Sequence, residues 1–323
     1  MNETASIEIG LNAAIVGIRE GQPNVLVTRE GDKWDALPYG PFTPLDHRTL
    51  DIGLRNWVRE QTGLELGYVE QLYTFGDRGR HAQRGDAGPH VMSVGYLALI
   101  GEEPQLELKG ASFGRWYAYL PWEDWRAGKP DILASEIEPR LKQWAERCEV
   151  DETRVAALTR PERLRICFAL GSGADWDEEK VLERYELLYE AGLVAEARRD
   201  GRSAAKQWDD LPQLGRPMQF DHRRILATAI SRLRGKLKYR PVVFEMMPET
   251  FTLFELQKTV EAVSGHHLHK QNFRRLVENG GLVEPTGDVS TETGGRPAKL
   301  FRFRRDILLE RPSLGVRMKA GRI

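Results

Sequence analysis

Three helical patterns followed by two short strands close the chain, and this order constrains the fold more than any other feature of the sequence. The first pattern, at 221–239, has apolar residues at every third or fourth position. Two further helical patterns follow at 252–265 and 268–281, and the span 282–305 holds two short strands around a Gly- and Thr-rich loop. Because apolar residues at helical spacing give each helix one buried face, the order predicts a small α+β domain at the end of the chain.

This order is that of a winged helix-turn-helix, a fold that places one helix in the major groove of DNA. A helical wheel of the third helix places Phe273, Leu276 and Val277 inward. The outward face then carries side chains that read base edges or contact phosphates. The predicted DNA contacts on this helix are His269, Lys270, Gln271, Asn272, Arg274 and Arg275. The alternative is the same fold used for protein contacts.

The hairpin that follows predicts further DNA contacts. In "KLFRFR", Phe301 and Phe303 alternate with Arg302 and Arg304, so the phenylalanines face the core and the arginines face the phosphates. The turn "GGRPAK" adds charge at the tip. The predicted contacts on the hairpin are Arg296, Lys299 and Arg302.

A group of histidines precedes the third helix. Side chains of His266, His267 and His269 are possible metal ligands, but no acidic or Cys partner stands at ligand spacing. A role for these residues at the start of the helix, near the phosphates, is favoured over a metal site, and no metal is predicted.

The formal charge is distributed unevenly along the chain. Residues 1–220 sum to −10 and residues 221–323 to +9, which leaves −1 in total. Arg224, Arg232 and Arg234 belong to the basic part and lie largely off the apolar face of its first helix. A change of sign on this scale predicts a polyanion partner for the basic part. The alternative is a basic linker face with no partner.

The first part of the chain is rich in strands. A hairpin is predicted from 11–20 and 24–30, which flank a Gly-Gln-Pro turn. The other predicted segments are strands at 66–76, 90–100 and 114–122 and helices at 46–62, which Gly63 ends, and 134–148. This mixture predicts a mixed sheet with helices on both faces, an α/β/α arrangement.

A helical connector is predicted between these two parts. The segment 175–194 has Asp175 or Asp177 as its N-cap and Gly192 as its end. The predicted division is a ligand-sensing domain at 1–150, a connector at 151–217 and a DNA-binding domain at 218–323.

Cellular location is constrained by what the chain lacks. Its two cysteines, Cys148 and Cys167, form no CxxC pair and are expected to be buried thiols. The first residues do not have the pattern of a signal peptide, and the apolar run at 91–100 is too short to span a bilayer. We expect a cytoplasmic protein that contacts no membrane.

The segment "GPFTPLDHRTLDIGLRNWVREQTGL", at 40–64, resembles a Nudix box, G-x5-E-x7-R-E-U-x-E-E-x-G-U, where U is a bulky apolar residue. Counting back from Gly63, the three helix glutamates of the box fall on Trp57, Glu60 and Gln61. Only one carboxylate is kept, and one carboxylate cannot hold the Mg²⁺ cluster that cleavage of a diphosphate needs. The resemblance implies a Nudix fold without Nudix catalysis, and we expect Trp57 to pack in the core.

The two ends together resemble one family, the Nudix-related transcriptional regulators of NAD metabolism (NrtR/NadQ-like, alphaproteobacterial branch). The segments that carry the resemblance are "LYTFGDRGR" (72–80), "MSVGYLAL" (92–99), "FDHRRILATAISRLRGKLKYRP" (220–241), "FTLFELQKTVEAVSG" (251–265), "LHKQNFRRLVENGGLVEPTG" (268–287) and "GGRPAKLFRF" (294–303). The resemblance implies a homodimeric repressor of NAD biosynthesis genes that binds a palindromic DNA operator. Its Nudix-like domain would sense NAD or another adenine nucleotide, such as ADP-ribose or ATP, and it would require no cofactor.

The same resemblance implies a nucleotide site. The loop after "FGD" faces the nucleotide cleft in the family, which places Asp77, Arg78 and Arg80 there. Arg29 suits a phosphate and Trp34 suits an adenine ring, although Trp34 is equally a packing residue. Glu60 completes the predicted ligand-binding set.

Two other functions are open at this point. One is an active Nudix hydrolase of ADP-ribose-type diphosphates fused to a winged helix, using Glu60 with Asp46, Asp51 or Glu65. The other is a ligand-binding adaptor that contacts protein rather than DNA.

Overall fold

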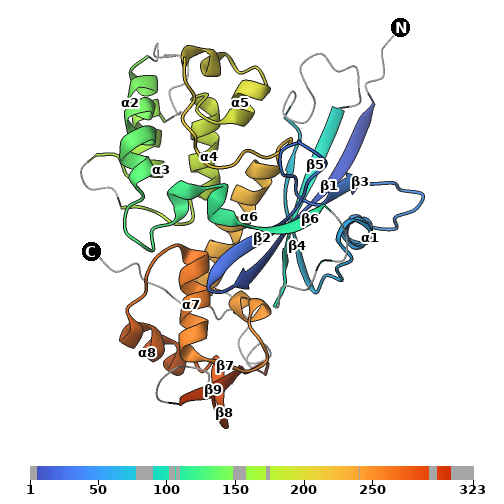
Figure 1. The fold of residues 1–323 in the computed structure, drawn as a ribbon, viewed down its shortest axis with the longest axis vertical. Helices are drawn as coiled ribbons and strands as arrows, with labels where there is room; N and C mark the ends of the chain where they lie inside the picture. The colour runs from blue at the N-terminus through green and yellow to red at the C-terminus, as the bar shows by residue number, and fades with distance from the viewer. Residues whose placement is uncertain are drawn as a thin grey trace.

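The computed structural model describes residues 6–77, 90–101, 106, 110–147, 158–171, 175–239, 241–290 and 297–306. Three parts are visible in Figure 1: a twisted sheet with α1 beside it, a lobe of helices α2 to α5, and a third part at the lower end of the view that holds α7, α8 and a small sheet. Helix α6 lies between the large sheet and the helical lobe. No helix in the described ranges is both long and apolar enough to cross a membrane.

The large sheet is mixed, as predicted. Its strands are β1 (Ile7–Arg19), β2 (Gln22–Thr28), β3 (Tyr39–Pro41), β4 (Tyr68–Phe75), β5 (His90–Leu99) and β6 (Ala111–Arg115). The order is β4-β5-β1-β2-β6, with β3 paired to β1. Strands β1 and β5 are parallel and the other pairs are antiparallel. The predicted β1–β2 hairpin is confirmed.

The strand predicted over 114–122 is wrong beyond Arg115. There the chain turns into two 3-10 helices, η1 (Trp116–Ala118) and η2 (Pro121–Glu123). Trp116, Tyr119 and Trp122 are fully buried and stand three residues apart. A strand of period two would alternate these residues between its two faces, so three buried rings at this spacing do not fit a strand with one exposed face.

Helix α1 (Leu50–Thr62) packs on one face of the sheet. The side chain of Thr49 caps it by accepting from Ile52 N, and Gly63 ends it at a φ of 77°. Leu54 and Val58 are its fully buried side chains. The helix begins four residues later than predicted because Asp46 and His47 are held in a turn by Thr43 O.

The helical lobe contains a short π-helix η3 (Leu133–Ile137), α2 (Glu138–Glu146), α3 (Arg160–Phe168), α4 (Val181–Glu190), α5 (Ala195–Arg199) and the 3-10 helix η4 (Ser203–Gln207). The helix predicted from residue 175 begins only at Val181. Asp177 does not cap it, because its Oδ1 accepts from Glu179 N in a turn that precedes the helix. Cys167 is buried as predicted, and Cys148 lies outside the described residues.

Helix α6 (His222–Tyr239) contacts both the sheet and α4. Our expectation that Arg234 lies off the apolar face is wrong, because its side chain has no exposed surface and binds Glu123 at 2.7 Å. All six basic residues of this helix have acidic partners that precede it in the chain. The pairs are Arg223–Glu196, Arg224–Asp77 and Glu186, Arg232–Glu70, Arg234–Glu123, Lys236–Glu70, and Lys238–Glu178 and Glu179.

The last part has the predicted order of a winged helix. It comprises η5 (Val242–Met246), β7 (Phe251–Thr252), α7 (Leu253–Ser264), α8 (Lys270–Gly280), β8 (Val283–Ser290) and β9 (Ala298–Phe303). The strands form a small sheet in the order β7-β9-β8. A capping box between Thr252 and Glu255 begins α7, and Gly265 ends it in the left-handed region.

Candidate DNA-binding face and nucleotide site

Helix α8 presents a polar face to solvent. Phe273 and Val277 are buried, and Leu276 is half-buried against Leu282, as the helical wheel predicted. Glu278 and Asn279 are exposed near the end of the helix, and the six predicted DNA contacts are all exposed: His269, Lys270, Gln271, Asn272, Arg274 and Arg275. The structure gives none of these six side chains a hydrogen bond or ion pair within the described residues. Their donors and acceptors are therefore available to a partner.

The predicted DNA contacts on the hairpin beside α8 differ in whether they already have a partner within the molecule. Lys299 is exposed and has no ion pair in the described part of the chain. Arg302 is exposed, but its Nε already donates to Glu284 Oε1 at 2.6 Å across the hairpin. Arg304 turns back instead of facing outward and donates to Gly281 O at 3.4 Å. Arg296 lies outside the described residues.

The two phenylalanines of the hairpin face inward, as predicted. Phe303 stacks on Phe244 with ring centroids 4.3 Å apart, and Phe301 is packed against the main hydrophobic cluster. This packing fixes the sheet to the rest of the winged helix, and Arg302, which lies between the two phenylalanines on β9, points away from it.

The histidines before α8 do not converge. His266 is half-buried beside Trp125, with ring centroids 5.9 Å apart, and this burial lowers the pKa of His266. The Nδ1 atom of His267 lies 3.3 Å from Glu261 Oε2, and His269 is the exposed N-cap of α8. Across the described ranges, no three His, Cys, Asp or Glu side chains are grouped as metal ligands.

The box helix α1 uses two of its three expected carboxylate positions for neutral contacts. Trp57 Nε1 donates to Pro41 O at 2.8 Å, and its ring lies so close to Gly40 that a Cβ there would be 2.2 Å away. Gln61 accepts from Tyr39 N at 3.2 Å and donates to Tyr39 O at 2.5 Å. Both side chains thus hold β3 against α1, and Trp57, which was expected in the core, is half-buried against the hydrophobic cluster at the edge of it.

These residues do not fit the Mg²⁺ cluster of a Nudix hydrolase. Glu60 is exposed on α1, with Trp57 and Gln61 in place of the other two carboxylates. Two of the acidic residues that an active hydrolase could use with Glu60 already lie near arginines: Asp51 pairs with Arg55 at 2.9 Å, and Glu65 lies 3.8 Å from Arg59.

Three of the predicted nucleotide contacts already have partners inside the molecule. Arg29, at the end of β2, binds Asp35 Oδ1 through Nε at 2.7 Å and Nη2 at 2.6 Å, and its side chain is 53% exposed. The ring of Trp34 lies 5.7 Å from the guanidinium carbon of Arg199 in the helical lobe. Asp77, after β4, pairs with Arg224 of α6. Arg78 and Arg80 lie outside the described residues.

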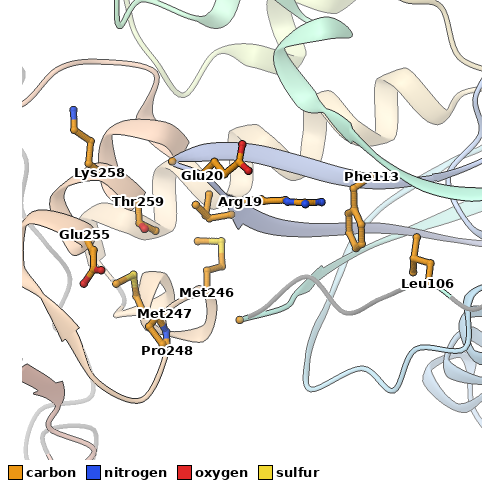
Figure 2. A pocket seen from close by; sticks show the side chains of 13 residues that line it. Arg19, Glu20, Leu106, Phe113, Met246, Met247, Pro248, Glu255, Lys258 and Thr259 are labelled. Carbon is orange, nitrogen blue, oxygen red and sulfur yellow. The ribbon is translucent and has the colours of Figure 1, made fainter. Parts of the chain in front are cut away.

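A cavity of about 860 Å³ opens elsewhere, between the β1–β2 turn and the winged helix. Figure 2 shows Met246, Met247 and Thr259 on one side of it and Phe113 on the other. None of the predicted nucleotide contacts lines it. The sequence carries no signal for this cavity, because segments more than 100 residues apart form its walls.

Comparison with known proteins identifies the last part of the chain. Residues 243–303 match the family described as the NrtR DNA-binding winged helix domain. This span is similar to the winged helix of NrtR. A curated relative, the "ADPR responsive transcriptional repressor NtrR" of Acinetobacter baylyi, is 42% identical over 102 residues, which are 31% of this chain and 40% of that protein. The match therefore spans only two fifths of the relative's length.

Solved structures extend the likeness to the whole fold. NrtR of Shewanella oneidensis has a TM-score of 0.54 at 20% identity, covering 92% of this chain and 94% of that one. The same protein in complex with a 27mer DNA has a TM-score of 0.50 at 21% identity, with the same coverage. A MutT/nudix family protein from Enterococcus faecalis has a TM-score of 0.51 at 17% identity, covering 94% and 89%. The predicted fold, a Nudix-like mixed sheet with a C-terminal winged helix, and the predicted resemblance to Nudix-related regulators are confirmed.

Proposed function

We propose that this protein is a transcriptional repressor that binds operators of NAD biosynthesis genes and responds to ADP-ribose. The observation that carries the proposal is the face of α8, where six polar side chains are exposed without partners among the described residues, in a span that matches the NrtR winged helix. Arg and Gln at such positions form bidentate contacts with guanine and adenine. The name of the curated relative supports both the repressor role and ADP-ribose as the first effector to test.

The proposed nucleotide site is on the Nudix-like domain, with Arg29 as the diphosphate contact and Trp34, Glu60, Asp77, Arg78 and Arg80 as further contacts. Arg29 supports this choice because half of its side chain is exposed and its planar fork matches a phosphate. NAD and ATP are the competing effectors. The proposal includes the division of the chain into a ligand-sensing domain at 1–150, a connector at 151–217 and a DNA-binding domain at 218–323.

The chain acts as a sensor rather than a hydrolase in this proposal. Trp57 and Gln61 support it, because they hold β3 with neutral groups where a Nudix hydrolase has carboxylates. We expect no Mg²⁺- or Mn²⁺-dependent hydrolysis of ADP-ribose or NADH. Steady turnover that disappears in Glu60→Gln would favour the hydrolase alternative instead.

A homodimer on a palindromic operator completes the proposal, and its place of action is the cytoplasm. Two α8 helices about one DNA turn apart, roughly 34 Å, would contact the two half-sites. A ligand changes DNA affinity when it binds the DNA-competent and DNA-incompetent arrangements differently. We expect ADP-ribose to favour the second arrangement and to release the operator.

Fluorescence anisotropy with labelled promoter DNA tests this function. The probes are the region upstream of the chain's own gene, the promoters of NAD biosynthesis genes and a scrambled duplex, each with and without ADP-ribose, NAD and ATP. We expect tight binding to at least one promoter and weakening by ADP-ribose. Equal binding to promoter and scrambled DNA would contradict a repressor, and sequence-specific binding that no nucleotide changes would contradict the sensor.

A further inference from the structure

The C-terminal end of α7, just before α8, is held by donors from the rest of the molecule. Tyr117 OH donates to Ala262 O at 2.8 Å, and Arg234 Nε donates to Val263 O at 3.0 Å. Trp125 N donates to Gly265 O at 2.8 Å. The last carbonyls of a helix have no partners within it, so these three bonds cap α7 from outside. The start of α8 is thereby tied to the segment 116–125.

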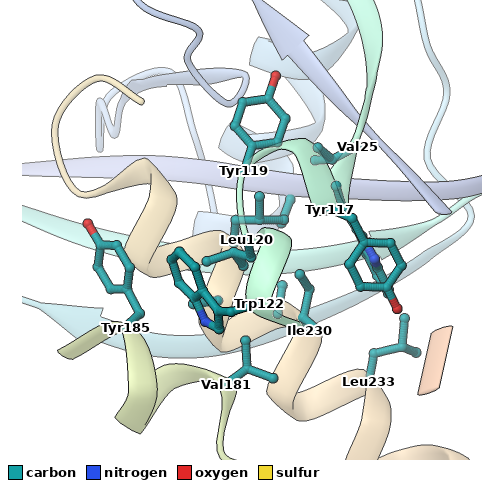
Figure 3. Close-up of a cluster of buried hydrophobic side chains, with 14 of the residues drawn as sticks. Val25, Tyr117, Tyr119, Leu120, Trp122, Val181, Tyr185, Ile230 and Leu233 are labelled. Atoms are coloured by element: carbon teal, nitrogen blue, oxygen red, sulfur yellow. The ribbon is translucent and has the colours of Figure 1, made fainter. Parts of the chain in front are cut away.

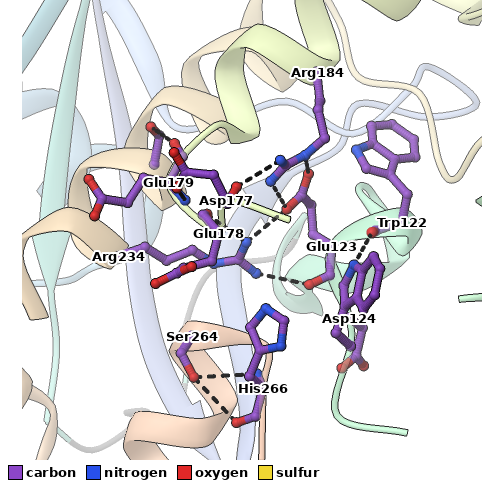
Figure 4. A network of polar contacts seen from close by, with 12 residues as sticks. Trp122, Glu123, Asp124, Asp177, Glu178, Glu179, Arg184, Arg234, Ser264 and His266 are labelled. Atoms are coloured by element: carbon purple, nitrogen blue, oxygen red, sulfur yellow. Dashed lines mark hydrogen bonds and ion pairs between the residues drawn. The ribbon is translucent and has the colours of Figure 1, made fainter. Parts of the chain in front are cut away.

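Glu123 fixes that segment. Its carboxylate accepts from Arg184 at 2.6 and 2.7 Å and from Arg234 at 2.7 Å, and all three side chains have no exposed surface (Figure 4). A Cβ on Gly265 would lie 2.5 Å from Glu123 O, so the end of α7 rests directly on this joint. A displacement of Glu123 must therefore move α7 with it, because the contact between Gly265 and Glu123 O has no room even for a Cβ atom.

Tyr119, on the same segment, is directed the other way. Figure 3 shows its hydroxyl pointing away from Leu120 and Trp122. That hydroxyl donates to Asp35 Oδ2 at 2.8 Å, and burial raises the pKa of Tyr119, which keeps the proton in place. The phenol rests on Gly114, where a Cβ would be 2.8 Å from the hydroxyl oxygen. Asp35 is 5% exposed, and its Oδ1 holds the exposed Arg29.

We propose that the Arg29–Asp35–Tyr119 relay is the regulatory connection between the nucleotide site and α8. This inference rests on the proposed function. A diphosphate bound at Arg29 competes with Asp35 for the guanidinium fork. Among the described residues, Tyr119 OH is then the remaining side-chain donor to the buried Asp35 carboxylate, and an uncompensated buried charge is unfavourable. A shift of Tyr119 relieves this unfavourable charge. The segment 116–125 transmits the shift to the end of α7, and from there it reaches α8.

Tyr119→Phe is the test, because it removes one hydroxyl and keeps the ring. The operator Kd is measured with and without saturating ADP-ribose, and the ADP-ribose Kd is measured in parallel. Tyr68→Phe is the matched control, since Tyr68 OH also donates to a carboxylate, Glu70 Oε2 at 2.9 Å, away from the relay. In wild type and Tyr68→Phe we expect ADP-ribose to change the operator Kd by about 5–150-fold. In Tyr119→Phe the nucleotide still binds but changes the operator Kd less than about twofold, well below that coupling range.

Arg29→Ala gives a second measurement, for which the direction of the change in operator Kd is also predicted, at a position that is 53% exposed. It removes the partner of Asp35, as a bound diphosphate does. Without any nucleotide, its operator Kd is expected to match that of wild type saturated with ADP-ribose. Wild-type coupling retained in Tyr119→Phe, or a wild-type operator Kd in Arg29→Ala, would overturn the relay while leaving the proposed function intact. Wild-type protein that shows no response to ADP-ribose would overturn the proposed function and the relay together.

Discussion

Helices α6 and α8 are both rich in basic residues, yet the two helices use them differently. The six basic residues of α6 all pair with acidic residues of the sheet domain or the helical lobe, and Arg223 and Arg234 have almost no exposed surface. The basic residues of α8 are exposed and unpaired in the described structure. Charge on α6 therefore holds the sheet and the helical lobe together, and charge on α8 is available to the proposed DNA partner.

The comparison shows that a sum of formal charge does not locate a DNA-binding face. Of the +9 on residues 221–323, α6 supplies +6, which its acidic partners neutralise inside the molecule. The NrtR-type span 243–303 has eight acidic and seven basic residues. Placement supplies what the sum lacks, because Lys270, Arg274 and Arg275 gather on one exposed face.

The largest expected effect is on stability, at the joint that α6 makes. Glu123→Gln leaves Arg184 and Arg234 buried without their carboxylate, and the free energy of unfolding is expected to fall by about 3–5 kcal/mol. Arg275→Ala, on exposed α8, is expected to change it by less than about 0.5 kcal/mol. Urea unfolding of both variants at neutral pH measures the contrast. Equal stability of the two variants would show that the paired charges around α6 stabilise the fold no more than the exposed charges of α8 do.

The pH dependence of that stability follows from the same joint. Burial alone would raise the pKa of Glu123, but the charges and hydrogen bonds of Arg184 and Arg234 outweigh it and lower the pKa below 4.5. A lowered folded-state pKa stabilises the protein above the unfolded pKa, and the gain is lost as the pH falls through the folded value. The stability gap between wild type and Glu123→Gln should be complete above pH 4.5 and shrink below it. A gap that stays constant down to acid unfolding would contradict this assignment.

The next effect is on operator recognition by α8. Gln271→Ala and Arg275→Ala remove candidate bidentate base contacts, each expected to cost about 1–3 kcal/mol for the operator. Binding to scrambled DNA should change much less. Competition assays with both duplexes give the specificity ratio. If neither variant lowers that ratio, α8 is not the helix that reads bases.

The hairpin provides a smaller and matched contrast. Lys299→Ala should weaken operator and scrambled DNA equally and lower the slope of log K against log salt by about 1. Arg302→Ala should lower the slope less, because Glu284 already neutralises Arg302 at 2.6 Å. Salt titrations of the two variants measure the difference. Equal slopes would show that the Arg302–Glu284 pair opens when DNA binds.

The smallest expected effect on DNA binding is that of a substitution on α6. Arg232 is the most exposed arginine of that helix in an ion pair, 38% exposed and 3.9 Å from Glu70. Arg232→Ala should leave operator affinity unchanged and alter stability by no more than about 1 kcal/mol, as exposed ion pairs do. A clear loss of DNA binding would place α6, too, on the DNA face.

The sequence predicted α8 and its hairpin well because periodicity determines which side chains face inward. Phe273 and Val277 follow the helical period, and Phe301 and Phe303 follow the period of a strand. Asp35, Tyr119 and Glu123 could not be found in this way. Their partners lie far away in the chain: Glu123 joins residues 61 and 111 positions distant, and Tyr119 joins one 84 positions distant. Nothing in local spacing marks a carboxylate whose role depends on how three segments dock.

The most direct measurement is a calorimetric titration of ADP-ribose into free protein and into protein saturated with operator. Linkage requires the operator to change nucleotide affinity by the same factor by which the nucleotide changes operator affinity, expected to be about 5–150-fold. We predict weaker binding of ADP-ribose to the operator-bound form. Equal affinity in the two titrations would contradict a Nudix-like domain that controls the NrtR-type winged helix.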